Sequence, residues 1–271
     1  MPRRTAYTEG TPCWIGYAGV DPTGAKDFYA PLFGWEFRSE GGRGHHLILP
    51  GGGGGGDGDG LVRGDGRDGG DGGEDIGGDR DGTGVQGDGD GTGSGTDDAR
   101  AGIVGGLGPS PAGPRFGSSW TVYLAAKDLG AAHRRAEERG ARVLVRGVPA
   151  GADGRLSLAV DPLGASFGLW HGAHDEGVVL VDEPGALTAA VLRTPHPDAS
   201  ATFYREVCGT EAATDEAERA GWVPYFGVVD VAAFEDRARA AGARLLAPGL
   251  LRDPWGAVFG VTARYGAARA A

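Results

Sequence analysis

The sequence lacks the features that mark several common classes of protein. Its two cysteines, Cys13 and Cys208, have no CxxC or metal-ligand spacing, so we interpret both as small buried hydrophobes and not as a disulfide or a nucleophile. No stretch approaches the roughly 18 consecutive apolar residues of a membrane span, and no apolar run follows the arginines at the N-terminus. We therefore expect a cytoplasmic protein that does not contact a membrane.

Positive charge is also scarce. The formal net charge is −11, and residues 51–100 carry 13 acidic and 4 basic side chains, which leaves the other residues nearly neutral. Binding to the phosphates of nucleic acid requires a basic face, and Lys and Arg are scattered along this sequence. The composition therefore predicts no nucleic-acid partner.

Large apolar residues are nearly absent from residues 51–100, which contain 23 glycines. Ordering such a segment would cost on the order of 50 kcal/mol, whereas burying its four large aliphatic residues would return only about 6–12 kcal/mol. One nine-residue stretch, "GGDGGEDIG", approximates a calcium-binding β-roll repeat, but a single degenerate copy cannot stack on a neighbour. We predict a long, disordered loop rich in Gly and Asp.

The rest of the sequence contains two pairs of repeated units, each with a strand, a helix and further strands. In the first pair, "DPTGAKDFYAPLFGWEF" recurs 175 positions later as "HPDASATFYREVCGTEA". In the second pair, "DPLGASFG" (161–168) recurs as "DPWGAVFG" (253–260), and Trp120, Tyr123 and Asp128 recur as Trp222, Tyr225 and Asp230. An Asp before a helix and a Gly after it predict where each helix begins and ends. The chain is therefore a duplicated two-unit domain.

These motifs, in this order, resemble the vicinal oxygen chelate (VOC) superfamily, and in particular the tandem glyoxalase/bleomycin-resistance-like proteins of actinobacteria. The resemblance implies an α+β fold in which paired βαβββ units form curved mixed-sheet cups. It assigns a first domain to residues 9–173 with the insert 51–100, a linker to residues 174–184, and a second, truncated domain to residues 185–264.

In metal-dependent members of this superfamily, the resemblance implies a His in the first strand of a unit and a Glu in the last strand. The first-strand positions here hold Trp14, Thr121, Ala189 and Val223, and the two last-strand positions that can be aligned hold Gly168 and Gly260. Only the Thr121 hydroxyl is a donor, so the sequence predicts no metal ligands and no cofactor.

The histidines do not replace the missing ligands. His45 and His46 are adjacent on a strand, so at most one of them faces the cup. His133 is expected to be solvated on a helix, and His196 replaces a capping Asp. His171 and His174 flank the end of a strand, where they could form a two-ligand surface site, but we expect capping or loop roles for them.

Strand alternation predicts which residues face the interior of each cup. The candidate ligand-binding residues of the first cup are Trp14, Thr121, Tyr123, Ser166 and Trp170. The residues predicted to line the second cup are Val191, Arg193, Val223, Tyr225 and Val258. Aromatic rings with a few hydroxyls suit a planar organic ligand, although large side chains can equally fill the interior of a curved sheet.

The second domain is short. The distance from Glu211 to Trp222 is about 23 residues less than the distance between their equivalents outside the insert, and the last unit is shorter by ten. We expect the third unit to keep little beyond its first strand and helix, and the fourth unit to lose one strand. The uncovered apolar residues should pack against the first domain or against a second copy, as in a homodimer, so that residues 1–173 fold alone and 185–271 do not.

Three functions remain open at this point. The first is metal-free binding or sequestration of a small organic molecule by a glyoxalase/bleomycin-resistance-like protein. The second is an enzyme of the same superfamily, similar to a glyoxalase, dioxygenase or hydroxylase. The third is a degenerate scaffold without a ligand. Whether the protein is an enzyme, and what its ligand is, are left open by the sequence.

Overall fold

The computed structural model describes residues 6–40, 44–51, 102–110, 117–150, 154–172, 177–178 and 180–265. The described residues all belong to one compact unit. The predicted disordered loop, 51–100, lies almost wholly outside the described residues. In the described part of the chain, no helix is long and apolar enough to cross a membrane.

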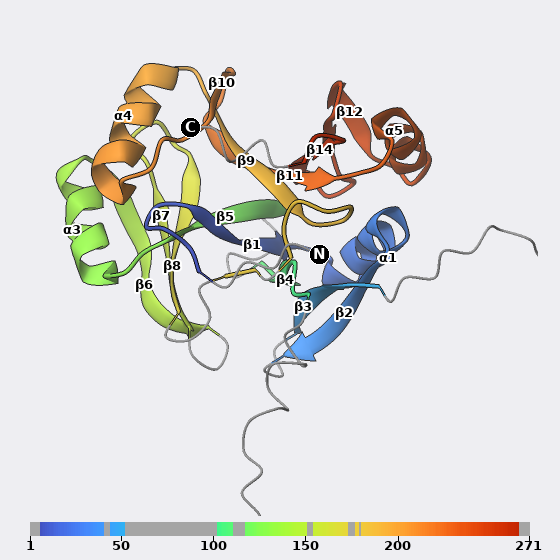
Figure 1. Cartoon of the computed structure of the whole chain (residues 1–271), viewed down its shortest axis with the longest axis horizontal. Coiled ribbons are helices and arrows are strands. Elements are labelled where there is room, and N and C mark those ends of the chain that lie inside the picture. Colours follow the sequence, from blue (N-terminus) through green and yellow to red (C-terminus); the bar gives the residue numbers. More distant parts are fainter. Residues whose placement is uncertain are drawn as a thin grey trace, which may run out of the picture. The chain divides into compact units, whose positions relative to one another are not determined.

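The first half of the chain forms an eight-stranded mixed sheet with the strand order β2-β3-β4-β1-β5-β8-β7-β6 (Figure 1). Its strands are β1 (Pro12–Gly19), β2 (Trp35–Glu40), β3 (His45–Pro50), β4 (Gly105–Pro109), β5 (Ser119–Ala125), β6 (Arg142–Ala150), β7 (Gly154–Val160) and β8 (Ser166–Gly172). The central strands β1 and β5 are antiparallel, and each has a parallel partner, β4 and β8 respectively. The sheet therefore consists of two βαβββ units joined through their first strands, as the sequence predicts.

The second half forms a six-stranded mixed sheet with the order β10-β9-β11-β14-β13-β12. Its strands are β9 (Leu187–Thr194), β10 (Thr214–Glu216), β11 (Gly221–Gly227), β12 (Arg244–Ala247), β13 (Leu250–Arg252) and β14 (Val258–Thr262). The α+β fold class with curled mixed sheets is confirmed. The domain boundaries at 9–173 and 185–264 stay a prediction.

The helices begin and end where local signals predict. Helix α1 (Pro22–Phe33) starts after Asp21, whose side chain accepts a hydrogen bond from the Gly24 N–H at 2.9 Å, and ends at Gly34 with φ of 69°. Helices α3 (Leu129–Glu138) and α5 (Val231–Ala240) start in the same way at an Asp. Helix α4 (Pro197–Cys208) starts at His196, which makes no capping hydrogen bond through its side chain.

The shortening of the second half is only partly as predicted. Strand β10 pairs in parallel with β9, as β4 pairs with β1, so the third unit has lost the equivalent of the β2–β3 hairpin. The loss of a strand from the fourth unit was a wrong prediction, because β12, β13 and β14 are all present. The missing residues come from the hairpin β12–β13, whose strands have 4 and 3 residues against 9 and 7 in β6–β7.

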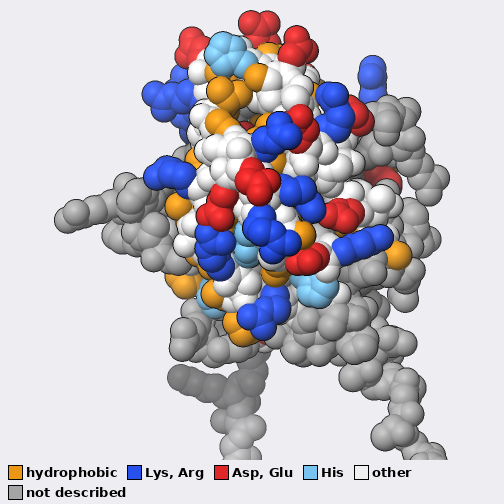
Figure 2. Space-filling view, turned by 90° about the vertical axis from the view of Figure 1, so that its left-hand side faces the viewer, with side chains coloured by type: hydrophobic (Ala, Val, Ile, Leu, Met, Phe, Trp, Pro, Cys, Tyr) orange, Lys and Arg blue, Asp and Glu red, His pale blue; other side chains and the backbone are white. Residues whose placement is uncertain are grey.

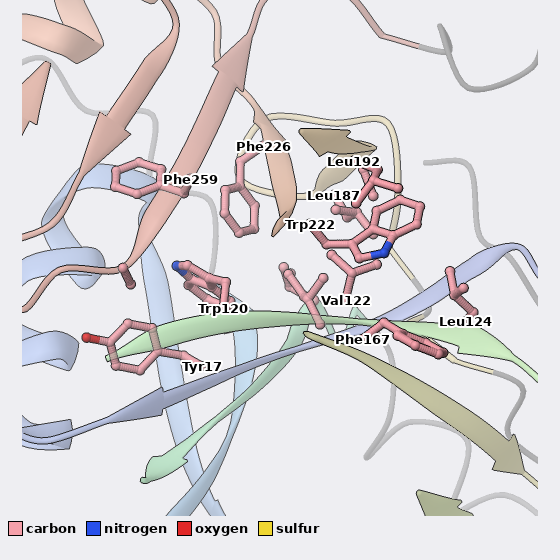
Figure 3. Packing of buried hydrophobic residues seen from close by; sticks show 14 of the residues in the cluster. Tyr17, Trp120, Val122, Leu124, Phe167, Leu187, Leu192, Trp222, Phe226 and Phe259 are labelled. Atoms are coloured by element: carbon pink, nitrogen blue, oxygen red, sulfur yellow. The ribbon is translucent and has the colours of Figure 1, made fainter. Parts of the chain in front are cut away.

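The two sheets share one hydrophobic core. Figure 3 shows Tyr17, Trp120 and Phe167 of the first sheet facing side chains of the second sheet. The Trp120 and Phe226 rings meet edge to face with centroids 5.3 Å apart. Burial of aromatic rings on both sides makes this interface a large hydrophobic contribution to stability, so each half covers apolar residues of the other.

A repeated pair of buried hydrogen bonds crosses this interface. The Tyr29 hydroxyl on α1 donates to Asp253 at 3.0 Å, and the Tyr204 hydroxyl on α4 donates to Asp161 at 3.1 Å. Each carboxylate also accepts a backbone N–H four residues further along its own turn. Burial raises the pKa of both carboxyl groups above the ordinary value for Asp. A helix of each half is thereby joined to a "DPxG" turn of the other half.

Charged side chains of both signs alternate over the surface that carries α3 and α4, and Figure 2 shows them intermixed on this face of the molecule. Several form ion pairs between neighbouring elements, such as Arg139 with Glu206 at 2.6 Å and Arg135 with Glu9 at 2.9 Å. Because these pairs are well exposed, each contributes little to stability. This face has no continuous basic surface.

Candidate functional site

The first cup is the face of the eight-stranded sheet opposite the shared core. Along β1, buried residues such as Ile15 and Tyr17 face the core, so Trp14 and Gly16 face the cup. Of the five candidate residues, the structure brings Trp14, Tyr123 and Trp170 into one apolar cluster. Thr121 is half-buried on β5 and pairs with Gly16 of β1, whereas Ser166 is exposed at the start of β8.

Two tryptophan side chains stack on one another in this cup. The indole rings of Trp14 and Trp170 lie 5.3 Å apart between centroids and only 9° from parallel. Trp170 is buried, and Trp14 is half-buried. The strand between them, β5, has the small residue Ala125 opposite Trp170, which leaves room above it for the two rings.

Tyr123 lies on the floor of the cup. A Cβ added at Gly168 would be 2.0 Å from the Tyr123 ring, and one added at Gly16 would be 3.8 Å from the Tyr123 hydroxyl. The ring therefore covers Gly168 and directs its hydroxyl toward Gly16. The side chain is 8 % exposed, and its hydroxyl, which makes no hydrogen bond with another described residue, is not fully buried. Burial raises the pKa of Tyr123 to about 12, so the hydroxyl stays protonated at physiological pH.

The positions where a metal would be held offer no donor set. The structure adds one ligand position that the sequence did not reveal, Gly106 on β4. Gly106 pairs with Gly16, two residues after Trp14, just as Gly168 on β8 pairs with Tyr123, two residues after Thr121. The four converging positions of this cup therefore hold Trp14, Gly106, Thr121 and Gly168. Over the described residues, no group of three His, Cys, Asp or Glu side chains could hold a metal ion. The residues present do not fit a divalent metal.

His45 and His46 face opposite sides of the sheet, as predicted. A Cβ on Gly108 would touch the His45 ring, so exposed His45 lies over the cup face of β4, while His46 contacts Lys26 of α1 at 3.3 Å on the other face. The prediction that His133 is solvated was wrong. Its side chain is buried between α3 and the sheet, where Nε2 lies 2.8 Å from the Ser157 hydroxyl.

The last two histidine predictions have different outcomes. The ring of His171 lies 3.0 Å from the Ala126 carbonyl oxygen through Nδ1, which accords with a local structural role. His174 lies outside the described residues.

The second cup repeats the tyrosine over glycine but lacks the tryptophan pair. A Cβ added at Gly260 would be 2.3 Å from the Tyr225 ring, and Tyr225 pairs with Gly260 as Tyr123 pairs with Gly168. Tyr225 is partly exposed. Of the other predicted lining residues, Val191, Arg193 and Val258 are partly exposed and Val223 is buried. This face is therefore shallower and has fewer aromatic rings.

Two cavities lie elsewhere on the described surface. One of about 310 Å³ lies beside the start of α3 and is lined in part by Lys127, Arg155 and His171. The other, of about 200 Å³, lies between the end of α1 and α5. Neither is lined by the aromatic residues of the first cup, where the stacked tryptophans occupy the space themselves.

Residues distant in sequence complete the aromatic cluster. Tyr7 and Val178 pack against it, and the Tyr7 hydroxyl donates to the Val178 carbonyl oxygen at 2.8 Å. Sequence reasoning missed them because neither lies in a periodic segment. It also missed Gly16 and Gly106, whose role is to leave space and which no motif marks.

No family model matches the chain. Curated relatives do: CFP32 of Mycobacterium tuberculosis, provisionally named a glyoxylase, is 28% identical over 96% of this chain and 97% of its own length. The anthracycline biosynthesis protein DauV of a Streptomyces strain is 26% identical over 95% of this chain and 79% of its own length.

Solved structures share the fold at low identity. The Mn(II)-bound glyoxalase from Novosphingobium aromaticivorans has a TM-score of 0.51 at 14% identity, over 95% of this chain and 87% of that one. The 2,3-dioxygenase LapB from a Pseudomonas strain has a TM-score of 0.53 at 11% identity, over 94% and 93%. These likenesses extend over both halves of the chain.

Proposed function

Because the chain belongs to the vicinal oxygen chelate superfamily, we propose that its first cup binds a small planar organic molecule without a metal ion. The observation that carries this proposal is the position of Tyr123. Its ring fills the space above Gly168, where a metal-dependent relative would need a carboxylate. Metal binding is therefore opposed both by the missing donors and by an aromatic ring in their place.

The character of the cup face supports an organic ligand. Two indoles and a phenol are gathered within one cluster, and among the described residues the Tyr123 hydroxyl makes no hydrogen bond. Aromatic side chains with a few polar groups are typical of small-molecule sites. A relative named for anthracycline biosynthesis is compatible with a planar ligand.

A second candidate is a scaffold that binds nothing. The observation that favours it is the stack of Trp14 on Trp170, because the two indole rings already pack against each other and do not require a ligand as a packing partner. An enzyme of the glyoxalase, dioxygenase or hydroxylase type is a third candidate, and the name of CFP32 favours the glyoxalase type.

The test combines elemental analysis with ligand screening. We expect protein purified without chelators and dialysed extensively to hold far less than one equivalent of manganese, iron, nickel or zinc. We also expect planar aromatic compounds to raise the melting temperature of this metal-free protein. About one tightly held metal per chain would contradict metal-free binding, whereas a library without any stabilising compound would favour the scaffold.

A further inference from the structure

The two indoles of the first cup are not held equally. A Cβ added at Gly154 would lie 2.6 Å from the tip of the Trp170 ring, so buried Trp170 lies tightly over β7. Trp14 is half-buried, and a Cβ added at Gly106 beneath it would lie 3.5 Å from its ring, which is an ordinary contact. Trp14 is therefore the ring that can move.

Opening the stack would create space for one planar group. The rings are already within 9° of parallel, so a flat molecule between them would contact both faces. It would lie about 3.5 Å from each ring, which requires the indole planes to separate to about 7 Å. The contact between the indoles would be replaced by two contacts of the same kind.

Two hydrogen-bond donors lie beside that space. The Tyr123 hydroxyl is directed toward Gly16, and the Trp14 Nε1 would lie 3.7 Å from a Cβ on Gly106. Gly16 and Gly106 are direct partners across β1 and β4, so the two donors lie over adjacent glycines. Neither has a hydrogen-bond partner in the described part of the chain. A neutral oxygen on a flat molecule in the stack could accept a hydrogen bond from the Tyr123 hydroxyl.

We propose that the Trp14–Trp170 stack opens to sandwich a planar aromatic carbonyl compound, whose carbonyl oxygen accepts a hydrogen bond from Tyr123. This inference rests on the proposed function and specifies its ligand class.

The experiment compares two soluble probes that differ only in the carbonyl group, 9-oxofluorene-2-carboxylate and fluorene-2-carboxylate. Affinities are measured by calorimetry on the full-length protein. We expect the ketone to bind about fivefold more tightly than the hydrocarbon, the ratio that one neutral hydrogen bond supports.

Variants assign the site. Tyr123→Phe should weaken ketone binding about fivefold and abolish the preference for the ketone, while leaving hydrocarbon binding unchanged. Tyr225→Phe is the matched control, because Tyr225 covers Gly260 in the second cup as Tyr123 covers Gly168, and it should change neither affinity. Trp170→Leu should weaken both probes about tenfold. Thermal unfolding of each variant checks that it is folded.

The outcomes separate this inference from the proposed function. A wild-type protein that binds both probes equally, or a Tyr123→Phe variant that retains the preference, overturns the carbonyl assignment but leaves metal-free ligand binding intact. Failure of both probes to bind, at concentrations where other library compounds stabilise the protein, likewise overturns only the ligand class. If no library compound binds either, both proposals fail.

Discussion

A methyl group added at Gly168 tests whether the Tyr123 ring occupies the metal-ligand position. The added Cβ would lie 2.0 Å from the nearest ring atom, whereas carbon atoms in contact are about 3.5 Å apart. The Tyr123 ring would have to move by roughly 1 Å or more inside a packed cluster. Overpacking of this kind lowers the free energy of unfolding by about 1–3 kcal/mol. Gly168 does not have a positive φ, so Ala itself is compatible with the backbone.

The net effect includes a small gain. Ala in a strand is favoured over Gly by about 0.5–1 kcal/mol, so Gly168→Ala should lower the free energy of unfolding by about 1–2 kcal/mol. In a Tyr123→Ala background the clash is absent, and the same change should be neutral or stabilising. The two substitutions should therefore couple by about 2 kcal/mol in a double-mutant cycle. Gly260→Ala should cost less, because partly exposed Tyr225 can swing aside.

Urea denaturation monitored by circular dichroism gives the four free energies of the cycle, provided that the m-value is unchanged. A Gly168→Ala cost that is the same with and without the Tyr123 ring would refute this account of the site. It would also remove the steric argument against a metal, which would then rest on the missing donors alone.

Three further predictions concern the fold. Burial raises the pKa of Asp253 above the ordinary value of 3.8, so the folded state loses stability as the pH rises from 3.8 through the pKa of the folded state. The stability of Asp253→Asn relative to the wild type should therefore increase between about pH 3.5 and pH 7. A difference between the two proteins in urea denaturation that does not change with pH would contradict the direction of the shift. Replacing residues 51–100 by a short turn between Pro50 and Ala101 should change the free energy of unfolding by about 2 kcal/mol at most, because β3 and β4 already pair. Loss of soluble protein on this replacement would show that the segment has a structural role. The shared core leads us to expect that neither 1–173 nor 185–271 folds alone but that co-expression restores a complex, and a cooperatively unfolding monomer of either fragment would disprove this.

Local signals in the sequence predicted the elements well because those signals act over three or four residues. The Asp21 cap and the glycine at position 34 define α1 without reference to the rest of the chain. The recurrence of the α1 motif 175 positions later likewise identified α4, even though the His196 side chain makes no capping hydrogen bond there. Strand alternation also placed Trp14, Tyr123 and Trp170 on one face, because successive side chains of a strand point to opposite sides.

Predictions failed where the outcome depended on a distant partner. His133 is polar and lies on a helix, yet it is buried because Ser157 of β7 lies opposite it. The shortened last unit kept every strand because the hairpin contracted, and residue counts cannot tell a shorter strand from a missing one.

The sequence by itself determined the repeated units, their helix ends and the lack of His or carboxylate ligands at the positions it could align, because each depends on residue identity and short spacing. Only the tertiary structure decided what occupies the cup. The Tyr123 ring covers Gly168 because β5 and β8 are paired, and the two indoles meet because β1 and β8 flank β5. These contacts depend on strand order and on closure of the sheet around distant segments, which residue spacing does not encode.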